Sequence, residues 1–418
     1  MTEEEKENDT NQNQKMIFGV SVPVFIMGLV SLFTDISSEM IQSILPLFIL
    51  SIGGTILILG IISGTTSALS NILKGFTGWL SDKVNKRKPF VVAGYTISNL
   101  AKPFIGFSPS WEFVLGLKAT DRFGKGLRTS SRDVLISYYA VERGKAFGLH
   151  RSMDTMGAVI GSLLTFILLY LAWSFSEIIF FSIIPGLFAI ALILTIKDVD
   201  PIKLENESFK KKLRFYEHPK VDKVDKKFIK LIIILGVIEF ASLDIAFLII
   251  RSIDYIPSES IYLIPLFYLV TNVVYVVFSP INGSISDKIG RKPVIVVGLS
   301  VLLISCVILA FPTDVSLFSL IIIVLIYAMF GFYLASIDPI SRAYIADLAG
   351  KNKRGRAYGY YYLSVGLISL AESIIFALIY EFYSFTWAFI YISIMLFMCI
   401  IVFVLTDFSK IVGEKEIK

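Results

Sequence analysis

The stretch GWLSDKVNKRKPFVVAG, residues 78–94, recurs as GSISDKIGRKPVIVVG at residues 283–298, one residue shorter. Two further stretches repeat at similar distances: RGKAFG at Arg143 matches RGRAYG at Arg354, and SRDVLI at Ser131 resembles SRAYIA at Ser341. All three pairs lie roughly 205 to 211 residues apart. This regular spacing predicts a chain built from two similar halves.

The composition is typical of a membrane protein. Of the 418 residues, 55% are hydrophobic and 17% are charged, which is too little charge to cover a soluble domain of this size. Apolar runs of about 20 residues recur, and each can cross ~30 Å of hydrocarbon as a helix. They predict about twelve spans, near 17–50, 54–80, 90–108, 111–138, 145–173, 177–196, 229–250, 260–284, 293–312, 316–345, 356–380 and 385–406.

Lys and Arg are concentrated in alternate connections between these spans. The positive-inside rule then predicts that these connections and both termini are cytoplasmic, in a multi-pass protein of the cell membrane. The expected fold is all-α, with two pseudo-symmetric six-helix halves about an axis normal to the membrane. The predicted segments are a cytosolic tail at 1–16, a six-helix bundle at 17–197, a cytosolic linker at 198–228, a second bundle at 229–407 and a cytosolic tail at 408–418.

The fourth span contains DRFGKGLRTSSRD, residues 121–133. On a helical wheel its charges form a stripe about 140° wide, and a charge at mid-membrane costs roughly 2.5 kcal/mol or more unless it meets a partner or water. The stripe is therefore predicted to line a polar cavity between the halves, although a salt bridge at the cytoplasmic end is an equal alternative for Arg132. The stripe consists of Lys118, Asp121, Arg122, Lys125, Arg128, Thr129, Arg132 and Asp133.

Carboxylates in other spans could face these cations. Asp35 and Glu39 are four residues apart in the first span and therefore share a helix face. A carboxyl group in an apolar site can take up and release a proton as a cation approaches or withdraws. The predicted substrate cavity comprises Asp121, Lys125, Arg128, Arg132, Asp154, Asp244, Asp338 and Glu372. His150 could also shuttle protons, but a structural histidine is the simpler interpretation.

The repeated loop contains a glycine, an aspartate four residues later, and a second glycine followed by basic residues; Asn85 replaces that second glycine in the first copy. It resembles the loop between spans two and three of the major facilitator superfamily, and the resemblance extends over nearly the whole chain. It implies a gating latch in which an aspartate binds a helix N-terminus and nearby arginines. The latch residues are Gly78, Asp82, Lys83, Arg87, Gly283, Asp287, Lys288, Gly290 and Arg291.

Two further patterns resemble the drug:proton antiporters of this superfamily. Arg122-Phe-Gly-Lys125-Gly126 is similar to their Arg-x-x-Gln-Gly motif, with lysine in place of glutamine. Gly148, Gly157 and Gly161 are similar to their span-five glycines, and small residues there permit close helix contact. The usual proline after the last glycine is absent, which weakens the resemblance. The longer pattern looks like an uncharacterised prokaryotic branch and implies no substrate.

The resemblance implies a proton carrier in the first span, tuned by the span-four arginine. Asp35 is the first candidate, Glu39 the second, and Arg122 the tuning cation. A static ion pair joining spans one and four is the alternative role for these residues.

The predicted function is a secondary active transporter of a small organic molecule, working by alternating access, with proton-coupled efflux and with proton or sodium as coupling ion. The alternative is a carrier of an anionic metabolite or phosphate ester, bound by the basic stripe. A membrane enzyme or sensor is disfavoured because no nucleophile-base set or phosphate-binding glycine loop occurs. Cys306 and Cys399 lie inside apolar spans, so neither a metal nor a disulfide is expected. We expect no cofactor, no nucleic-acid partner and a monomer in the lipid bilayer.

Overall fold

The computed structural model describes residues 16–84, 87–140, 142–197 and 236–405, and at 74–84, 130, 143 and 342–360 it describes the backbone alone. The first half begins with a two-stranded antiparallel hairpin. Its elements are β1 (Met16–Ile17), β2 (Val20–Ser21), α2 (Val22–Gln42), α3 (Leu45–Ser51), α4 (Ile56–Val84), α5 (Lys88–Phe104), η1 (Ile105–Phe107), α6 (Trp111–Tyr139), α7 (Arg143–Tyr170), α8 (Phe175–Phe181) and α9 (Ile183–Leu194).

The second half is also helical. Residues 236–240 form a helical segment at the start of its described part. The elements that follow are α13 (Ile245–Ser252), η3 (Ile253–Tyr255), η4 (Ser258–Leu263), α14 (Ile264–Ile289), α15 (Arg291–Leu309), α16 (Leu317–Phe382) and α17 (Phe385–Leu405).

Within the described residues, nine helical segments are long and apolar enough to cross a membrane. Three predicted spans are not among them, for different reasons. α5 has 17 residues, α6 carries the charged stripe, and the seventh span lies partly outside the described residues.

Two span predictions need correction. The run 17–50 is not one helix, because α2 ends at Gln42 and α3 begins at Leu45. Pro46 lies in the first turn of α3, where its ring would clash with the carbonyl of the residue four positions earlier in a continuous helix. The runs 316–345 and 356–380 belong to a single helix, α16.

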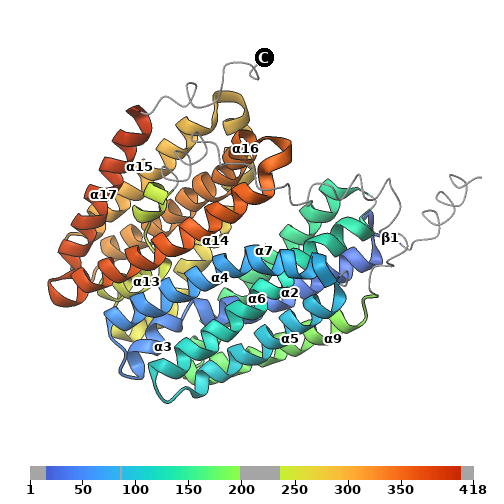
Figure 1. Ribbon diagram of the computed structural model, residues 1–418. Helices are drawn as coiled ribbons and strands as arrows, with labels where there is room; N and C mark the ends of the chain where they lie inside the picture. Colours follow the sequence, from blue (N-terminus) through green and yellow to red (C-terminus); the bar gives the residue numbers. More distant parts are fainter. Residues whose placement is uncertain (1–15, 85–86, 141, 198–235, 406–418) are drawn as a thin grey trace, which may run out of the picture.

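α16 nevertheless supplies two spans, Leu317–Ser341 and Tyr361–Phe382. Tyr333 and Glu372, one from each span, line the same cavity. A straight helix of about 40 residues would separate them by about 60 Å. The helix therefore changes direction between its two apolar segments, as the orange ribbon in Figure 1 shows.

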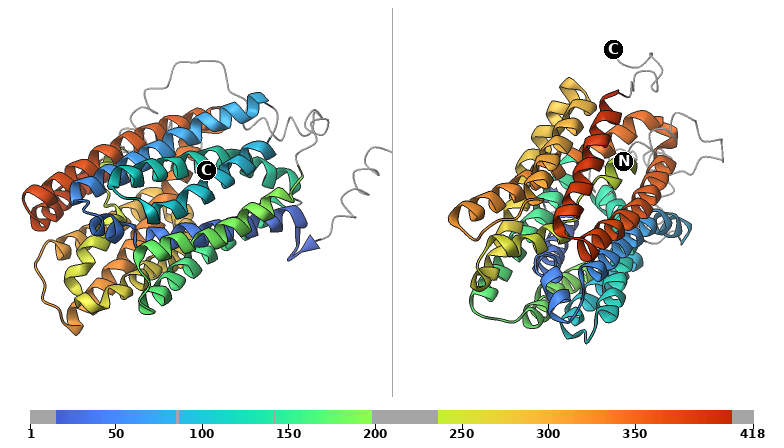
Figure 2. Two further views of the ribbon diagram at one scale, coloured as in Figure 1. Left: turned by 90° about the horizontal axis from the view of Figure 1, so that it is seen from below. Right: turned by 90° about the vertical axis from the view of Figure 1, so that its left-hand side faces the viewer.

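The helices form two groups, α2–α9 in blue to green and α13–α17 in yellow to red, and Figure 2 shows them from two further sides. α4 packs against α16, and α7 packs against α14. The first contact is close, since a Cβ added at Gly60 would lie 2.6 Å from the backbone oxygen of Ser373. At one end of this contact the Glu381 carboxylate accepts hydrogen bonds from the backbone nitrogens of Ile56 (2.8 Å) and Leu57 (3.3 Å), at the start of α4.

The predicted close contact of the span-five glycines holds for two of the three. A Cβ at Gly157 would lie 2.4 Å from the backbone oxygen of Leu32, and one at Gly161 would lie 2.7 Å from that of Ile36. Gly148 is different, because a Cβ there would meet nothing within 4 Å. The prediction of close packing is wrong at Gly148, which lies nearer the start of α7.

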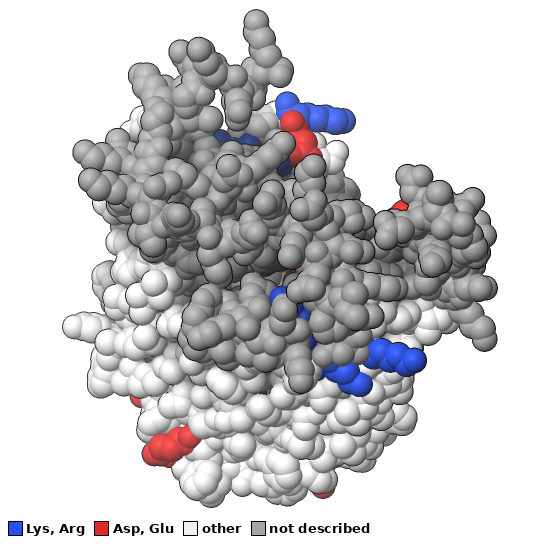
Figure 3. All heavy atoms as spheres, turned by 45° about the vertical axis from the view of Figure 1, so that its right-hand side comes forward, with Lys and Arg blue, Asp and Glu red and all other residues white. Residues whose placement is uncertain are grey.

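Large apolar side chains face outward. Phe188, Phe397 and Leu367 are more than half exposed, and charged side chains are scarce over the described surface in Figure 3. A soluble protein of this size would not expose so much apolar area. These surfaces are suited to contact with lipid.

Candidate functional site

Two adjoining cavities lie at the contact between the helix groups. The larger has a volume of about 290 Å³ and the smaller about 190 Å³. Gln42 of α2 and Lys118 and Arg122 of α6 line both. The larger cavity is completed by residues of α4, α13 and both spans of α16.

The first helix group supplies the cations. Lys102 of α5 is 2% exposed, and its Nζ donates to the Thr34 backbone oxygen at 3.2 Å and to Ser38 Oγ at 2.9 Å. Lys118 is 6% exposed, and its Nζ lies 3.3 Å from Gln42 Oε1. The four cations that line the cavities are Lys102, Lys118, Arg122 and Lys125.

Asp121 lies among these cations. It accepts a hydrogen bond from Ser98 Oγ at 2.6 Å, and its Oδ2 lies 3.8 Å from Arg122 Nε. Together with Glu39 it offsets part of the positive charge of the smaller cavity, which has four cations and two carboxylates in its lining. The wall formed by α5 and α6 is therefore basic on balance.

The second helix group supplies carboxylates to the larger cavity: Glu239, Asp244, Asp338 and Glu372. Asp244 caps α13 by accepting from the Ala246 backbone nitrogen at 2.8 Å, and it also accepts from Ser63 Oγ of α4. Glu372 is 1% exposed, and its Oε2 accepts from Ser373 Oγ at 3.3 Å. Its Oε1 has no hydrogen-bond partner among the described residues. The wall formed by this group is acidic.

A pair of carboxyl groups lies behind the basic wall, where α2 packs on α7. Asp35 and Asp154 are close enough to share a hydrogen bond, and Lys125 is a cationic neighbour of Asp35. Two carboxyl groups can share a hydrogen bond only when one of them carries a proton, because an ionised carboxylate has no donor. A hydrogen bond between Asp35 and Asp154 would therefore need a proton on one of the two carboxyl groups.

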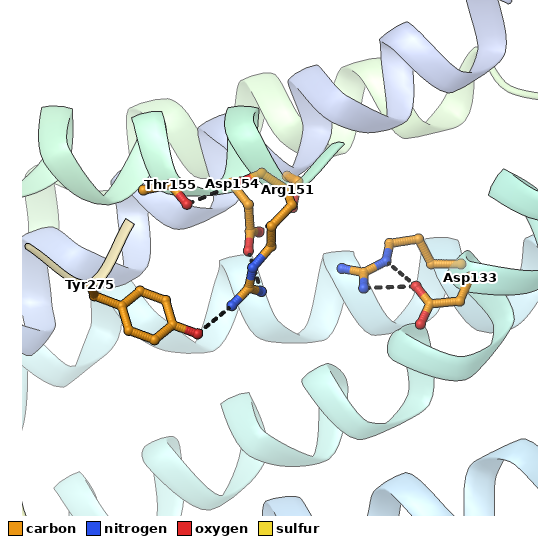
Figure 4. A network of polar contacts seen from close by, with 7 residues as sticks. Asp133, Arg151, Asp154, Thr155 and Tyr275 are labelled. Carbon is orange, nitrogen blue, oxygen red and sulfur yellow. Dashed lines mark hydrogen bonds and ion pairs between the residues drawn. The ribbon is translucent and has the colours of Figure 1, made fainter. Parts of the chain in front are cut away.

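Polar contacts connect this region to the second helix group. Asp154 accepts from Ser31 Oγ at 2.6 Å and pairs with Arg151 Nη1 at 3.1 Å. Arg151 Nη2 also lies 3.3 Å from the Tyr275 hydroxyl of α14, and Figure 4 shows the guanidinium between the two partners. In a second such contact, the Tyr268 hydroxyl donates to Glu39 Oε2 at 2.6 Å.

The structure brings most of the predicted site residues together. Those that line one of the two cavities are Glu39, Asp121, Arg122, Lys125, Asp244, Asp338 and Glu372. Asp35 and Asp154 form the carboxyl pair. Lys125 and Lys102 are both cationic neighbours of Asp35, whereas Arg122 lies next to Asp121.

Three predicted cavity residues, Arg128, Arg132 and Asp154, do not line either cavity; Asp154 belongs instead to the carboxyl pair described above. Arg128 is 4% exposed and lies over the Tyr95 ring, with its guanidinium carbon 4.3 Å from the ring centre. Arg132 instead binds Asp133 through Nε (3.0 Å) and Nη2 (2.8 Å), the salt-bridge alternative. The helical wheel placed the whole arc toward the cavity, but α5 packs over one side of α6.

The second copy of the repeated loop is described in full. Gly290 has a φ of 95° and separates α14 from α15, a conformation that favours glycine. Asp287 pairs with Arg291 at 2.5 Å, and Arg291 also donates to Ser286 Oγ at 2.7 Å. These contacts lie within the second half, and bridging between halves in another conformation stays a prediction.

For the other predicted latch residues, the structure gives positions within the fold. Lys288 lies in the last turn of α14, and a Cβ at Gly283 would meet nothing within 4 Å. Arg87 is buried and precedes α5. At Gly78, Asp82 and Lys83 the structure describes the backbone alone, so the predicted roles of these residues are not tested.

Lys102 and Tyr268 line the smaller cavity but were absent from the sequence-based site. A signal existed for Lys102, because a lysine inside the apolar run 90–108 is itself a candidate functional residue. Tyr268 gave no such signal, since it is one of 19 tyrosines and nothing in its local sequence indicates a partner in another half.

Two bundles of membrane-crossing helices around a charged internal cavity define a polytopic membrane protein of the transporter class. The model of the Major Facilitator Superfamily matches residues 27–271 and 232–417. The chain therefore belongs to the major facilitator superfamily, as its motifs predicted. This is a family of transporters and not of enzymes, and its all-α fold of about twelve membrane helices agrees with the helices described above.

Relatives and solved structures agree with this assignment. The chain is 34% identical to an uncharacterised MFS-type transporter of Methanocaldococcus jannaschii, over 88% of this chain and 91% of the relative. It is 24% identical to an uncharacterised protein of Mycobacterium tuberculosis, over 86% of each.

Two solved structures share the fold. The nucleoside transporter NupG gives a TM-score of 0.74 at 12% identity, covering 92% of this chain and 98% of that one. A POT family transporter in complex with 5-aminolevulinic acid gives 0.75 at 13% identity, covering 95% and 98%. At these identities the similarity establishes the fold alone.

Proposed function

We propose that this protein is a secondary active transporter that exports a small organic molecule by alternating access, driven by inward proton flow. The observation that carries the proposal is the Asp35–Asp154 pair, two neighbouring carboxyl groups that can share one proton, with Lys125 as a cationic neighbour. A carboxyl pair that can share a proton next to a cation supports such coupling, because a change in the distance to the cation changes how readily the pair binds the proton.

The contacts between the halves explain how protonation and movement become linked. Arg151 binds both Asp154 and Tyr275 of α14, and Glu39 accepts a hydrogen bond from Tyr268 of α14. Asp154 and Glu39 are therefore both connected to the second half. When the halves separate on this side, these hydrogen bonds break and the charge balance around Asp35 and Glu39 changes. Proton uptake or release then accompanies the conformational change.

The direction and the orientation rest on the sequence. Export follows from the resemblance to drug:proton antiporters. The basic connections support cytoplasmic termini in the cell membrane. The solved neighbours named above bind a nucleoside or 5-aminolevulinic acid according to their names, which supports a small organic substrate here. We propose a monomer as the working unit.

The basic wall favours a second candidate, a carrier of an anionic metabolite or phosphate ester. Four cations against two carboxylates line the smaller cavity, and Arg and Lys are suited to phosphate and carboxylate binding. Thermal stabilisation of the purified protein by phosphate esters, lost in Lys125→Gln, would favour this candidate.

Transport in proteoliposomes tests the coupling. With an imposed pH gradient we expect accumulation driven by the gradient, reduced at least about 10-fold in Asp35→Asn because the amide at position 35 cannot take up or release a proton. The matched control is Asp314→Asn, at an exposed aspartate remote from the cavities. Gradient-driven transport that is unchanged in Asp35→Asn contradicts the role of Asp35, and dependence on a sodium gradient instead contradicts proton coupling.

A further inference from the structure

The larger cavity has walls of opposite charge from different halves of the protein. Lys118 and Arg122 line it from α6, and Asp244, Asp338 and Glu372 line it from the second helix group. A cavity for a simple anion needs no acidic wall, and a cavity for a simple cation needs no basic one. In this cavity the basic residues come from the first half and the acidic residues from the second. The proposed proton coupling does not explain this arrangement, which is therefore attributed to ligand binding.

Lys118 of the basic wall and Glu372 of the acidic wall do not form an ion pair with each other. Lys118 and Glu372 are 6% and 1% exposed. Among the described residues, no direct ion pair joins either of them to a group of opposite charge. The hydrogen bond of the Lys118 ammonium is to the neutral amide of Gln42, and Glu372 Oε1 has no hydrogen-bond partner in the described part of the chain.

Such an arrangement is costly when the cavity contains no solute. A buried charge without a partner costs several kcal/mol, and water in a small cavity offsets only part of this. A ligand with an anionic group at one end and an ammonium at the other supplies both missing partners at once. A monoanion or a monocation would satisfy one wall and leave the other unpaired.

We propose that this cavity binds a small zwitterion, with its anionic group on Lys118 and Arg122 and its ammonium group toward Glu372 and Asp244. The volume of about 290 Å³ is at the lower end of the range for ligand pockets, so the ligand is small. This inference rests on the proposed function only in taking the cavity as the substrate site. In place of a purely anionic substrate, it assigns a substrate that also carries a cationic group.

Binding to the purified full-length protein tests the proposal without requiring transport. The probes are glycine, dialanine and trialanine, each compared with its N-acetyl derivative, which is an anion, and its C-terminal amide, which is a cation. We expect at least one zwitterion to raise Tm and to bind at least about 10-fold more tightly than both of its derivatives. An N-acetyl form that binds as tightly as its zwitterion overturns the proposal, as does a panel in which no zwitterion binds.

Two substitutions should give crossed effects. Lys118→Gln should weaken the zwitterion and the anion but leave the cation unchanged, whereas Glu372→Gln should weaken the zwitterion and the cation but leave the anion unchanged. General damage to the fold would weaken all three ligands alike. The controls are Lys197→Gln and Glu259→Gln at exposed positions. Loss of all three ligands in parallel overturns the assignment of the two ends.

The proposal of a zwitterionic ligand and the proposal of proton coupling can be refuted separately. Affinity is measured at a fixed pH without a gradient, and Asp35→Asn should retain the preference for the zwitterion while losing gradient-driven transport. Zwitterion binding without any dependence of transport on pH contradicts the proposed coupling alone. Gradient-driven transport of an anion, with no preference for the zwitterion, contradicts the present inference alone.

Discussion

The two walls of the larger cavity come from halves that share one plan, yet they differ in charge and in how the charges are satisfied. In the first half, the Lys118 ammonium has a neutral partner, Gln42 Oε1 at 3.3 Å, and Arg122 Nε lies 3.8 Å from Asp121 Oδ2. In the second half, Glu372 leaves one carboxylate oxygen without a partner among the described residues. The repeated loops are similar, whereas the charged residues are not. A duplicated scaffold can therefore keep the sequence of its repeated loop while its two halves acquire cavity residues of different charge.

The strongest way to break this contrast is to make both walls acidic. Lys118→Glu places a carboxylate beside Asp121, and we expect transport to fall at least about 100-fold because like charges at such a site cost several kcal/mol. Initial rates in proteoliposomes measure the effect.

The control for this change is Lys197→Glu, which alters the same residue type at an exposed position and should keep near-normal rates. Transport by Lys118→Glu within a few-fold of the unmodified protein would mean that the sign of the wall is irrelevant.

A smaller effect is expected from pushing the walls apart. Gly60→Val would place its side chain against the Ser373 backbone oxygen, where even a Cβ would lie at 2.6 Å. Overpacking of this kind costs about 1–3 kcal/mol, so Tm should fall and transport should slow. Thermal unfolding measures the first effect, and proteoliposome rates the second.

Gly148→Val is the matched control, because a Cβ there meets nothing within 4 Å. Equal losses of stability in the two valine variants would show that helix propensity, and not the contact between the halves, determines the result.

The smallest effect is expected for one hydrogen bond between the halves. Tyr268→Phe removes the donor to Glu39, a bond whose net contribution is about 1–3 kcal/mol because its acceptor is a carboxylate. We expect a shift in the pH dependence of transport, with a rate change of about 10-fold at most. Tyr383→Phe, at a side chain that is 78% exposed, is the control. An unchanged pH profile in Tyr268→Phe would separate Glu39 from the coupling.

The sequence was sufficient to predict the helices and the charged cavity, because both depend on local patterns of hydrophobicity and charge. It did not show how those charges pair, because pairing depends on which helices become neighbours. Arg128 illustrates the limit: its place on α6 was predictable, but its contact with Tyr95 of α5 depends on packing. The partner of Asp35 was missed for the same reason, since Asp154 lies on α7 and the resemblance directed attention to Arg122.

The bond between Glu381 and the first turn of α4 has a mechanical consequence. If the halves separate at that end, as the proposed alternating access requires, two backbone N–H groups lose a carboxylate acceptor and water must replace it. These hydrogen bonds lie at an exposed site, so breaking them costs about 1 kcal/mol for each opening and not the larger penalty of a buried ion pair. These bonds would therefore bias the equilibrium toward the closed state only modestly, and their contribution should decrease as ionic strength rises.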